Sequence, residues 1–156
     1  MKKKFALGIA LAAMLATGTA FAGDFGIGVH GGFGFANGGG LNLAFSNVFV
    51  YIDALSISSN SMSLGGAVDF VSFVDKEIAD TLSWYIRMGV GAGLWGWDDE
   101  FAFAAGVRLP IGLSWRPVNM LELFIQAVPQ VGLQVVPKFG LWNNFFGGNI
   151  GIRLWL

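Results

Sequence analysis

The chain has 156 residues, a formal net charge of −1 and no cysteine. Charged residues make up 12% of it, against roughly 25% in ordinary soluble domains, and its mean hydropathy is +0.63. The lack of cysteine excludes a lipoprotein, a disulfide scaffold and a thiol enzyme. A chain this apolar is expected to aggregate in water unless its surface meets lipid or a partner.

The N-terminus predicts a secretory signal peptide. Residues 2–4 are lysines, residues 5–16 form an apolar run, and Ala20-Phe21-Ala22 matches an A-x-A cleavage site. Cleavage after Ala22 would leave residues 23–156 as one barrel domain. The alternative is an N-terminal membrane anchor, for which the apolar run is short. The mature chain has a charge of 6 − 10 = −4, which argues against nucleic acid as a partner.

The high hydropathy after the signal peptide does not come from spanning helices. A membrane-spanning helix needs about 20 apolar residues. Every stretch of that length is interrupted here by glycine or proline, for example by Pro110 and Pro129. In an exported chain, β-strands that close into a barrel are the remaining way to cross a membrane.

Alternation of apolar residues with polar residues or glycine, the repeat of a β-strand, runs through the first half of the mature chain. In the first strand Phe25, Phe33 and Phe35 are expected to face outward, with mostly glycine inward. Ser46-Asn47 predicts a two-residue hairpin turn. The strands predicted here cover residues 24–35, 41–45, 48–57 and 62–74.

The second half continues the pattern. Residues 75–81 are expected to form a charged connection, and residues 116–119 a tight turn. Pro129 predicts a bulge within its strand. Residues 135–144 form the longest late loop. The strands predicted here cover residues 82–94, 101–115 and 120–134, followed by a closing strand.

The closing strand organises the rest. Its polar positions and glycines are expected to face inward, and its apolar face runs to the last residue. A strand that ends the chain needs neighbours on both edges, so we expect it to pair with the first strand and close a barrel. It resembles the C-terminal assembly signal of bacterial outer-membrane barrels, although those usually end in Phe or Trp. The outward residues of this predicted signal are Ile150, Ile152, Leu154 and Leu156.

The predicted fold is therefore all-β: an eight-stranded antiparallel up-and-down transmembrane β-barrel that follows a signal peptide. Both termini and the shorter turns are expected on the periplasmic side. The alternative is a soluble barrel, in which the aromatic residues would be ordinary core. Tryptophans near strand ends predict rings at the membrane interfaces: Trp84, Trp97, Trp115, Trp142 and Trp155.

Charged and amide side chains at inward positions predict a polar network that fills the lumen, because unpaired buried charges are very costly. Asp69 is expected opposite Arg87, and Glu122 near Arg153. The alternative is a gate or selectivity ring in a narrow pore. The predicted network consists of Asp53, Asp69, Arg87, Arg108, Glu122, Gln126 and Arg153.

Three other sequence patterns bear on catalysis or ligand binding. His30 is the sole histidine, but it is expected in the lumen, whereas lipid-modifying barrel enzymes hold their His, Ser and acid on the lipid-facing wall. The glycine-rich runs lie inside strands, so they do not predict phosphate binding. Asp98-Asp99-Glu100 offers oxygen ligands for a divalent cation, but a solvated loop tip is the simpler interpretation. We predict no catalytic residues, metal or cofactor.

Three segments, residues 106–115, 121–129 and 147–153, resemble a family of small, poorly characterised outer-membrane barrel proteins of spirochaetes, and the glycine-rich opening at residues 25–35 is similar. The resemblance implies an eight-stranded outer-membrane barrel of the OmpA and OmpX size. It implies no activity.

The function predicted from the sequence is that of a non-enzymatic, monomeric integral protein of the bacterial outer membrane, with a structural or surface-contact role and a plugged lumen. The alternative is a porin-like narrow channel for ions or small or apolar solutes. Expected partners are outer-membrane lipids and, during biogenesis, periplasmic chaperones and the barrel-assembly machinery.

Overall fold

A computed structural model of the chain describes residues 25–35, 38–57, 61–97, 100–142 and 144–156. In these residues the chain forms β-strands joined by turns and bends. No helix in the described segments is long and apolar enough to cross a membrane. The predicted signal peptide, residues 1–22, lies outside the described residues.

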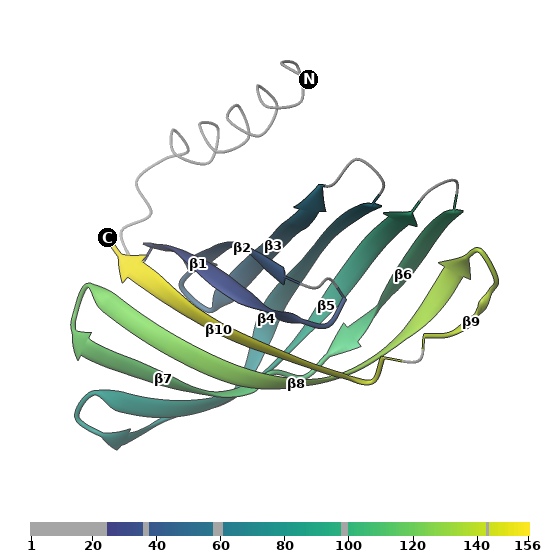
Figure 1. Cartoon of the computed structure of the whole chain (residues 1–156). Coiled ribbons are helices and arrows are strands. Elements are labelled where there is room, and N and C mark those ends of the chain that lie inside the picture. Colours follow the sequence, from purple (N-terminus) through teal and green to yellow (C-terminus); the bar gives the residue numbers. More distant parts are fainter. Residues whose placement is uncertain (1–24, 36–37, 58–60, 98–99, 143) are drawn as a thin grey trace.

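The strands form one antiparallel sheet that closes on itself (Figure 1). In chain order they are β1 (Phe25–Phe33), β2 (Gly38–Phe45), β3 (Val48–Ile57), β4 (Ser61–Ala79), β5 (Leu82–Trp97), β6 (Glu100–Arg108), β7 (Ile111–Val118), β8 (Leu121–Val136), β9 (Gly140–Leu141) and β10 (Phe146–Trp155).

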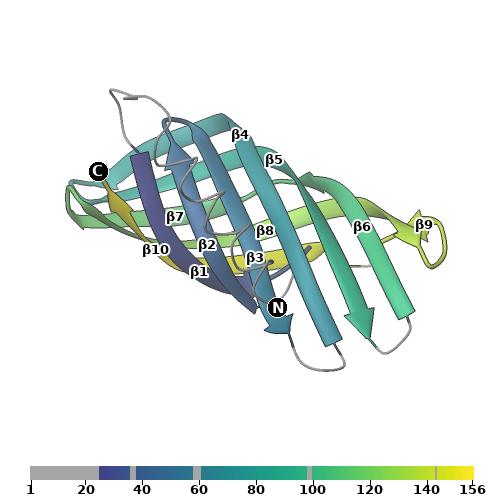
Figure 2. The same ribbon diagram turned by 90° about the horizontal axis from the view of Figure 1, so that it is seen from above.

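The closing strand β10 lies between the first strand and β8, as the sequence predicted. Trp155 is opposite Gly26 of β1, and Arg153 is opposite Glu122 of β8. Figures 1 and 2 show β10, in yellow, running between β1 and β8, so the two ends of the chain complete the wall. The all-β, antiparallel, up-and-down fold is confirmed.

Eight strands make up the wall, although ten are present in the described residues. β6 and β7 are two pieces of one predicted strand, interrupted at Leu109-Pro110, and β9 pairs only with β8. Proline has no N–H for the ladder, and Pro129 of β8 faces the same break. There the Leu109 N–H donates to the Pro129 carbonyl over 2.8 Å, and the Arg87 N–H donates to the Pro110 carbonyl over 2.9 Å.

Burial alternates along the wall, most clearly in β8 and β10. In β8, Ile125 is 55% exposed while its neighbours Phe124 and Gln126 are 3% exposed. In β10, Ile150 is 63% exposed and Arg153 is 1% exposed. The apolar face therefore points outward and the polar face inward, which is the reverse of a soluble barrel with an apolar interior.

One predicted turn is confirmed, while another turn and one connection differ in detail. The Ser46-Asn47 turn is present, and Ser46 has the positive φ, 54°, that tight hairpins use. The predicted turn at residues 116–119 is shifted, because β7 continues to Val118. Residues 75–79, expected in a charged connection, instead extend β4, because hydrogen bonds to β5 hold them in a strand whose side chains are exposed to solvent.

The first strand also departs from its expected faces at its end. Phe33 is 50% exposed, as expected, but Phe35 is 4% exposed and lies inside the ring. Gly34, between them, has a φ of +153°, a value that residues with a side chain rarely adopt. This backbone conformation breaks the alternation, so Phe35 turns inward rather than outward.

Candidate functional site

The polar side chains inside the ring form the candidate site. Of the seven residues predicted for the lumen, six are less than 10% exposed, and the side chain of Asp53 is 16% exposed. They come from β3, β4, β5, β6, β8 and β10, so the network exists only once the sheet has closed. The six most buried are Asp69, Arg87, Arg108, Glu122, Gln126 and Arg153.

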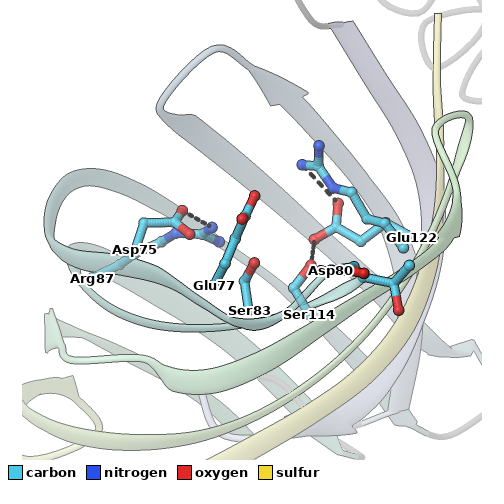
Figure 3. Close-up of a pocket in the computed structure, with 9 residues that line it drawn as sticks. Asp75, Glu77, Asp80, Ser83, Arg87, Ser114 and Glu122 are labelled. Carbon is cyan, nitrogen blue, oxygen red and sulfur yellow. Dashed lines mark hydrogen bonds and ion pairs between the residues drawn. The ribbon is translucent and has the colours of Figure 1, made fainter.

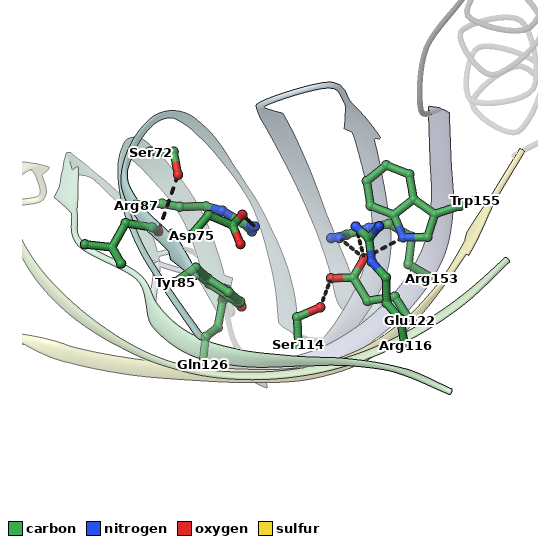
Figure 4. A network of polar contacts seen from close by, with 11 residues as sticks. Ser72, Asp75, Tyr85, Arg87, Ser114, Arg116, Glu122, Gln126, Arg153 and Trp155 are labelled. Carbon is green, nitrogen blue, oxygen red and sulfur yellow. Dashed lines mark hydrogen bonds and ion pairs between the residues drawn. The ribbon is translucent and has the colours of Figure 1, made fainter. Parts of the chain in front are cut away.

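Glu122, on β8 near the end of the ring where β1 begins and β10 ends, is the centre of the densest cluster (Figure 4). Arg153 Nη1 donates to Glu122 Oε2 over 2.9 Å, and Trp155 Nε1 donates to the same oxygen over 2.6 Å. Ser114 Oγ donates to Glu122 Oε1 over 2.7 Å. Both carboxylate oxygens are thus satisfied by buried donors, which is what a charge away from water requires.

Arg153 connects this cluster to the opposite wall. Its Nε donates to Asn42 Oδ1 on β2 over 2.8 Å. Its guanidinium also lies 4.9 Å from the ring centroids of both Phe49 and Phe124. Aromatic faces stabilise a desolvated guanidinium, so these contacts add to the ion pair with Glu122.

Asp69 and Arg87 do not form the predicted pair. Asp69 Oδ1 instead lies 3.0 Å from Arg108 Nε, in an ion pair buried on both sides. Arg87 Nη2 lies 3.4 Å from Asp75 Oδ2, and its guanidinium sits 3.6 Å from the Phe49 ring centroid. The prediction of an Asp69–Arg87 pair was wrong.

The position of the turn explains the difference. An Asp69–Arg87 pair needs a hairpin centred near residue 78, but the turn lies at residues 80–81, with Ala79 opposite Leu82. A regular ladder from that turn would place Asp69 opposite Ala92, and three register shifts bring it to Gly89, which still leaves Ser72 opposite Arg87. Neither the turn position nor the bulges can be deduced from alternation.

His30 faces the interior, where its Nε2 lies 2.7 Å from Asp53 Oδ1. The Tyr51 ring packs edge-on against it, with ring centroids 5.3 Å apart. Asp53 is therefore held by His30 rather than by an arginine. His30 belongs to the interior network and not to the outer wall, where a lipid-modifying site would have to lie.

A second, aromatic cluster closes the other end of the ring. Phe35 and Trp142 are stacked with centroids 4.4 Å apart, and Trp95 lies 5.8 Å from Trp142. Trp142 is 6% exposed, so its predicted position at the membrane interface is corrected. The segment between β9 and β10 turns its ring into the opening, where packing on Phe35 removes it from solvent.

The other predicted interface tryptophans divide into three groups. Trp115 is 48% exposed and Trp84 is half-buried, both on strands whose neighbouring outward residues are apolar. Trp155 is 8% exposed and donates to Glu122 inside the ring, because it shares the inward parity of Arg153. Its predicted interface position is therefore wrong. The side chain of Trp97 lies outside the described residues.

Two cavities lie inside the ring, and none of the residues that line one lines the other. The inner cavity, beside Phe35 and Arg108, has a volume of about 10 Å³, roughly the space of one water molecule. The larger one, about 300 Å³, lies at the end of the ring where β1 begins and β10 ends (Figure 3), and we call it the vestibule. Its charged lining residues are Asp75, Glu77, Asp80, Arg87, Arg116 and Glu122.

Several members of the network were not predicted. Ser114 and Trp155 each bond to Glu122 on the neighbouring strand β8, and Asn42 bonds to Arg153 on β10, two strands away. Asn42 had a signal in the sequence, since it is the one amide within a strand of leucine, alanine and glycine. In the described residues no group of three or more acidic or histidine side chains is placed to hold a metal ion.

Comparisons with known proteins give little beyond this geometry. No family model and no curated protein sequence matches the chain. Among solved structures, the chain is similar to Ail, the attachment invasion locus protein of Yersinia pestis, with a TM-score of 0.45 and 12% identity. That likeness covers 85% of this chain and 97% of that one.

Proposed function

We propose that this chain is an integral β-barrel of a bacterial outer membrane with a closed lumen, serving a structural or surface-contact role rather than that of a pore or an enzyme. The observation that carries the proposal is the inversion of the wall: apolar side chains cover the outside of the ring, while paired charges fill the inside.

The outer surface supports the membrane location. Large apolar side chains remain exposed around the whole ring, from Val29 on β1 (53%) through Phe70 on β4 (48%) and Val107 on β6 (50%) to Ile125 on β8 (55%). Soluble monomers rarely expose an apolar surface that is continuous on this scale. Acyl chains are the solvent that such a wall suits, because its strands pair with their neighbours around a closed ring.

The interior supports a closed lumen. Three arginines, Arg87, Arg108 and Arg153, project inward, and each lies near a carboxylate and over an aromatic ring. The aromatic cluster of Phe35, Trp95 and Trp142 packs at the far end. A small barrel has room inside for side chains and little else, and these side chains occupy the middle of the ring.

The membrane part of the proposal is tested by refolding residues 23–156 into detergent micelles and lipid vesicles. The folded barrel should migrate faster than the heated chain on gels, and its circular dichroism should be that of β-structure. Boiling should convert one gel form into the other. A protein that stays monomeric and soluble without detergent would contradict membrane insertion and favour the soluble barrel.

The closed lumen is tested separately by conductance in planar bilayers. The refolded protein should show no steady openings, and Arg108→Ala should not create any, because Arg87, Arg153 and the aromatic cluster remain. Steady openings that change with Arg108→Ala would contradict the closed lumen and favour the narrow channel. Export through the predicted signal peptide is tested by fractionating cells that express the full chain.

A further inference from the structure

The wall of the ring is uneven at the end where β1 begins and β10 ends. On the side of β3, β4 is paired only as far as Asp69, which lies opposite Phe49. Residues 70–79 continue as a strand that pairs with β5 alone. In the part of the chain that the structure describes, one edge of this segment therefore has no strand beside it, and we call it the free edge of β4.

The free edge indicates where this segment sits relative to lipid. Its unpaired backbone groups need water or polar headgroups as partners, since hydrocarbon would leave them unsatisfied. Phe70 and Phe73 are 48% and 58% exposed, and the exposed charged residues Asp75, Lys76 and Glu77 follow them, before Ile78, which is 59% exposed. Charged side chains enter this segment only beyond Phe73, as in a segment that passes from the acyl layer into the headgroup layer.

The vestibule lies on the inner face of the same segment. Asp75 and Glu77 of β4, with Asp80 from the following turn, line one part of it, and Arg87 of β5 projects into it from the adjacent strand (Figure 3). Arg116 of β7 lines the opposite part. A polar group that enters beside the free edge would meet side chains of both charges.

Arg87 has hydrogen-bonding capacity that the protein does not use. Its side chain is 5% exposed, yet its one ion-pair contact, to Asp75, is long at 3.4 Å, and its Nε has no hydrogen-bond partner. Arg116 lies 3.8 Å from Glu122, whose oxygens already accept closer bonds, and it is 47% exposed. Guanidinium groups bind anions, phosphate above all, so these two side chains are the candidate anion ligands of the vestibule.

Two acidic side chains of the vestibule also lack an ion-pair partner among the described residues. They are Glu77 and Asp80, and both are exposed. They lie on the same lining as the two arginines. An anion alone would be repelled by these carboxylates, and a cation alone would leave the arginines unused, so a ligand with both charges suits the lining best.

We propose that the vestibule binds a zwitterionic phosphoester, with its phosphate held by Arg87 and Arg116 and its primary ammonium by Glu77 and Asp80. This inference rests on the proposed function, because membrane insertion is what places the free edge of β4 in the headgroup layer. The ethanolamine headgroup of a phospholipid and free phosphoethanolamine both carry this chemistry.

Native mass spectrometry of the refolded barrel with equal amounts of phosphatidylethanolamine, phosphatidylglycerol and phosphatidylcholine tests the site. We expect about tenfold preferential retention of the ethanolamine lipid, since each alternative lacks one charge-assisted hydrogen bond at the ammonium end. Soluble phosphoethanolamine should displace it. Displacement with lipid preference assigns the source to the membrane, whereas binding of the soluble compound alone assigns it to a free solute.

Variants separate the two halves of the site. Glu77→Gln with Asp80→Asn should abolish the preference over phosphatidylglycerol, and Arg116→Gln should lower the retention of all three lipids. Asp98→Asn with Asp99→Asn, the same charge change in the β5–β6 connection, is the matched control and should change nothing. Arg87 is buried, so the folding of the Arg87→Gln variant is checked by migration on gels before its lipid retention is compared.

Equal retention of the three lipids with no binding of soluble phosphoethanolamine, or a preference that survives Glu77→Gln with Asp80→Asn, would overturn the inference. The proposed function has its own readout in the same samples. A barrel that shows heat-dependent migration but no lipid preference keeps the proposed function and loses the headgroup site. A chain that shows no such migration loses both.

Discussion

Arg153 and Glu122 lie directly opposite each other on β10 and β8, and their side chains meet at 2.9 Å with each 1% exposed. This pair joins the last strand to the wall in a position that water does not reach. Because side chains alternate along β10, the inward position of Arg153 places Trp155 inward as well and Leu154 outward.

The first prediction concerns this ion pair. Arg153→Met should destabilise the folded barrel by about 3–5 kcal/mol, because it leaves Glu122 buried without its counter-charge. Glu122→Gln in the same chain should restore part of that loss, since no uncompensated charge remains. Urea unfolding in micelles, followed by tryptophan fluorescence, measures both. Equal instability of the single and double variants would contradict the pairing.

The second prediction distinguishes the two aspartates of β4. Asp69→Asn should be clearly more destabilising than Asp75→Asn, because the Asp69–Arg108 pair is buried whereas Asp75 has a side chain that is 55% exposed. An exposed pair contributes only about 0–1 kcal/mol. The same unfolding assay checks the order. The reverse order would contradict the buried Asp69–Arg108 pair.

The third prediction tests the lipid-facing wall. Ile125→Arg should cost about 2–4 kcal/mol in vesicles, since position 125 lies midway along an outward apolar face. Val118→Arg, at the end of β7 and 59% exposed, is the matched control and should cost much less. If the wall faced water, both changes would be tolerated equally.

The fourth prediction concerns the aromatic cluster. Trp142→Ala should destabilise the barrel by about 3–5 kcal/mol, as expected for removal of a buried aromatic side chain. It should also expose Phe35, on which Trp142 stacks at 4.4 Å. Because the chain has no cysteine, Phe35→Cys can be labelled with a water-soluble maleimide. Labelling should be slow with Trp142 present and fast without it. Equal rates would show that Trp142 does not cover Phe35.

Much of the wall could be read from the sequence because a strand in a membrane barrel has only two faces. Along β8 and β10, each residue takes its face from its parity, so the exposure of Ile150 and the burial of Arg153 followed directly. Closure followed from the position of the last strand, which needs a neighbour on both edges. The pairing of Glu122 with Arg153 followed as well. Glu122 lies at the start of its strand and Arg153 near the end of the last strand, so both lie at the same end of the wall.

The partners of Asp69, Arg87, Phe35 and Trp142 could not be read in this way. The β4–β5 turn lies at residues 80–81 rather than near residue 78, which keeps Asp69 from facing Arg87, and one glycine at a φ of +153° turned Phe35 inward. Such irregularities have no period, so they leave no signal in a pattern of alternation. By itself the sequence determined the outward and inward faces of the regular strands and that the sheet must close, since the faces follow from local alternation and closure from the last strand's need for two neighbours. Only the tertiary structure decided which charges meet inside and that β4 extends past β3, because both depend on how far each strand slides along its neighbour.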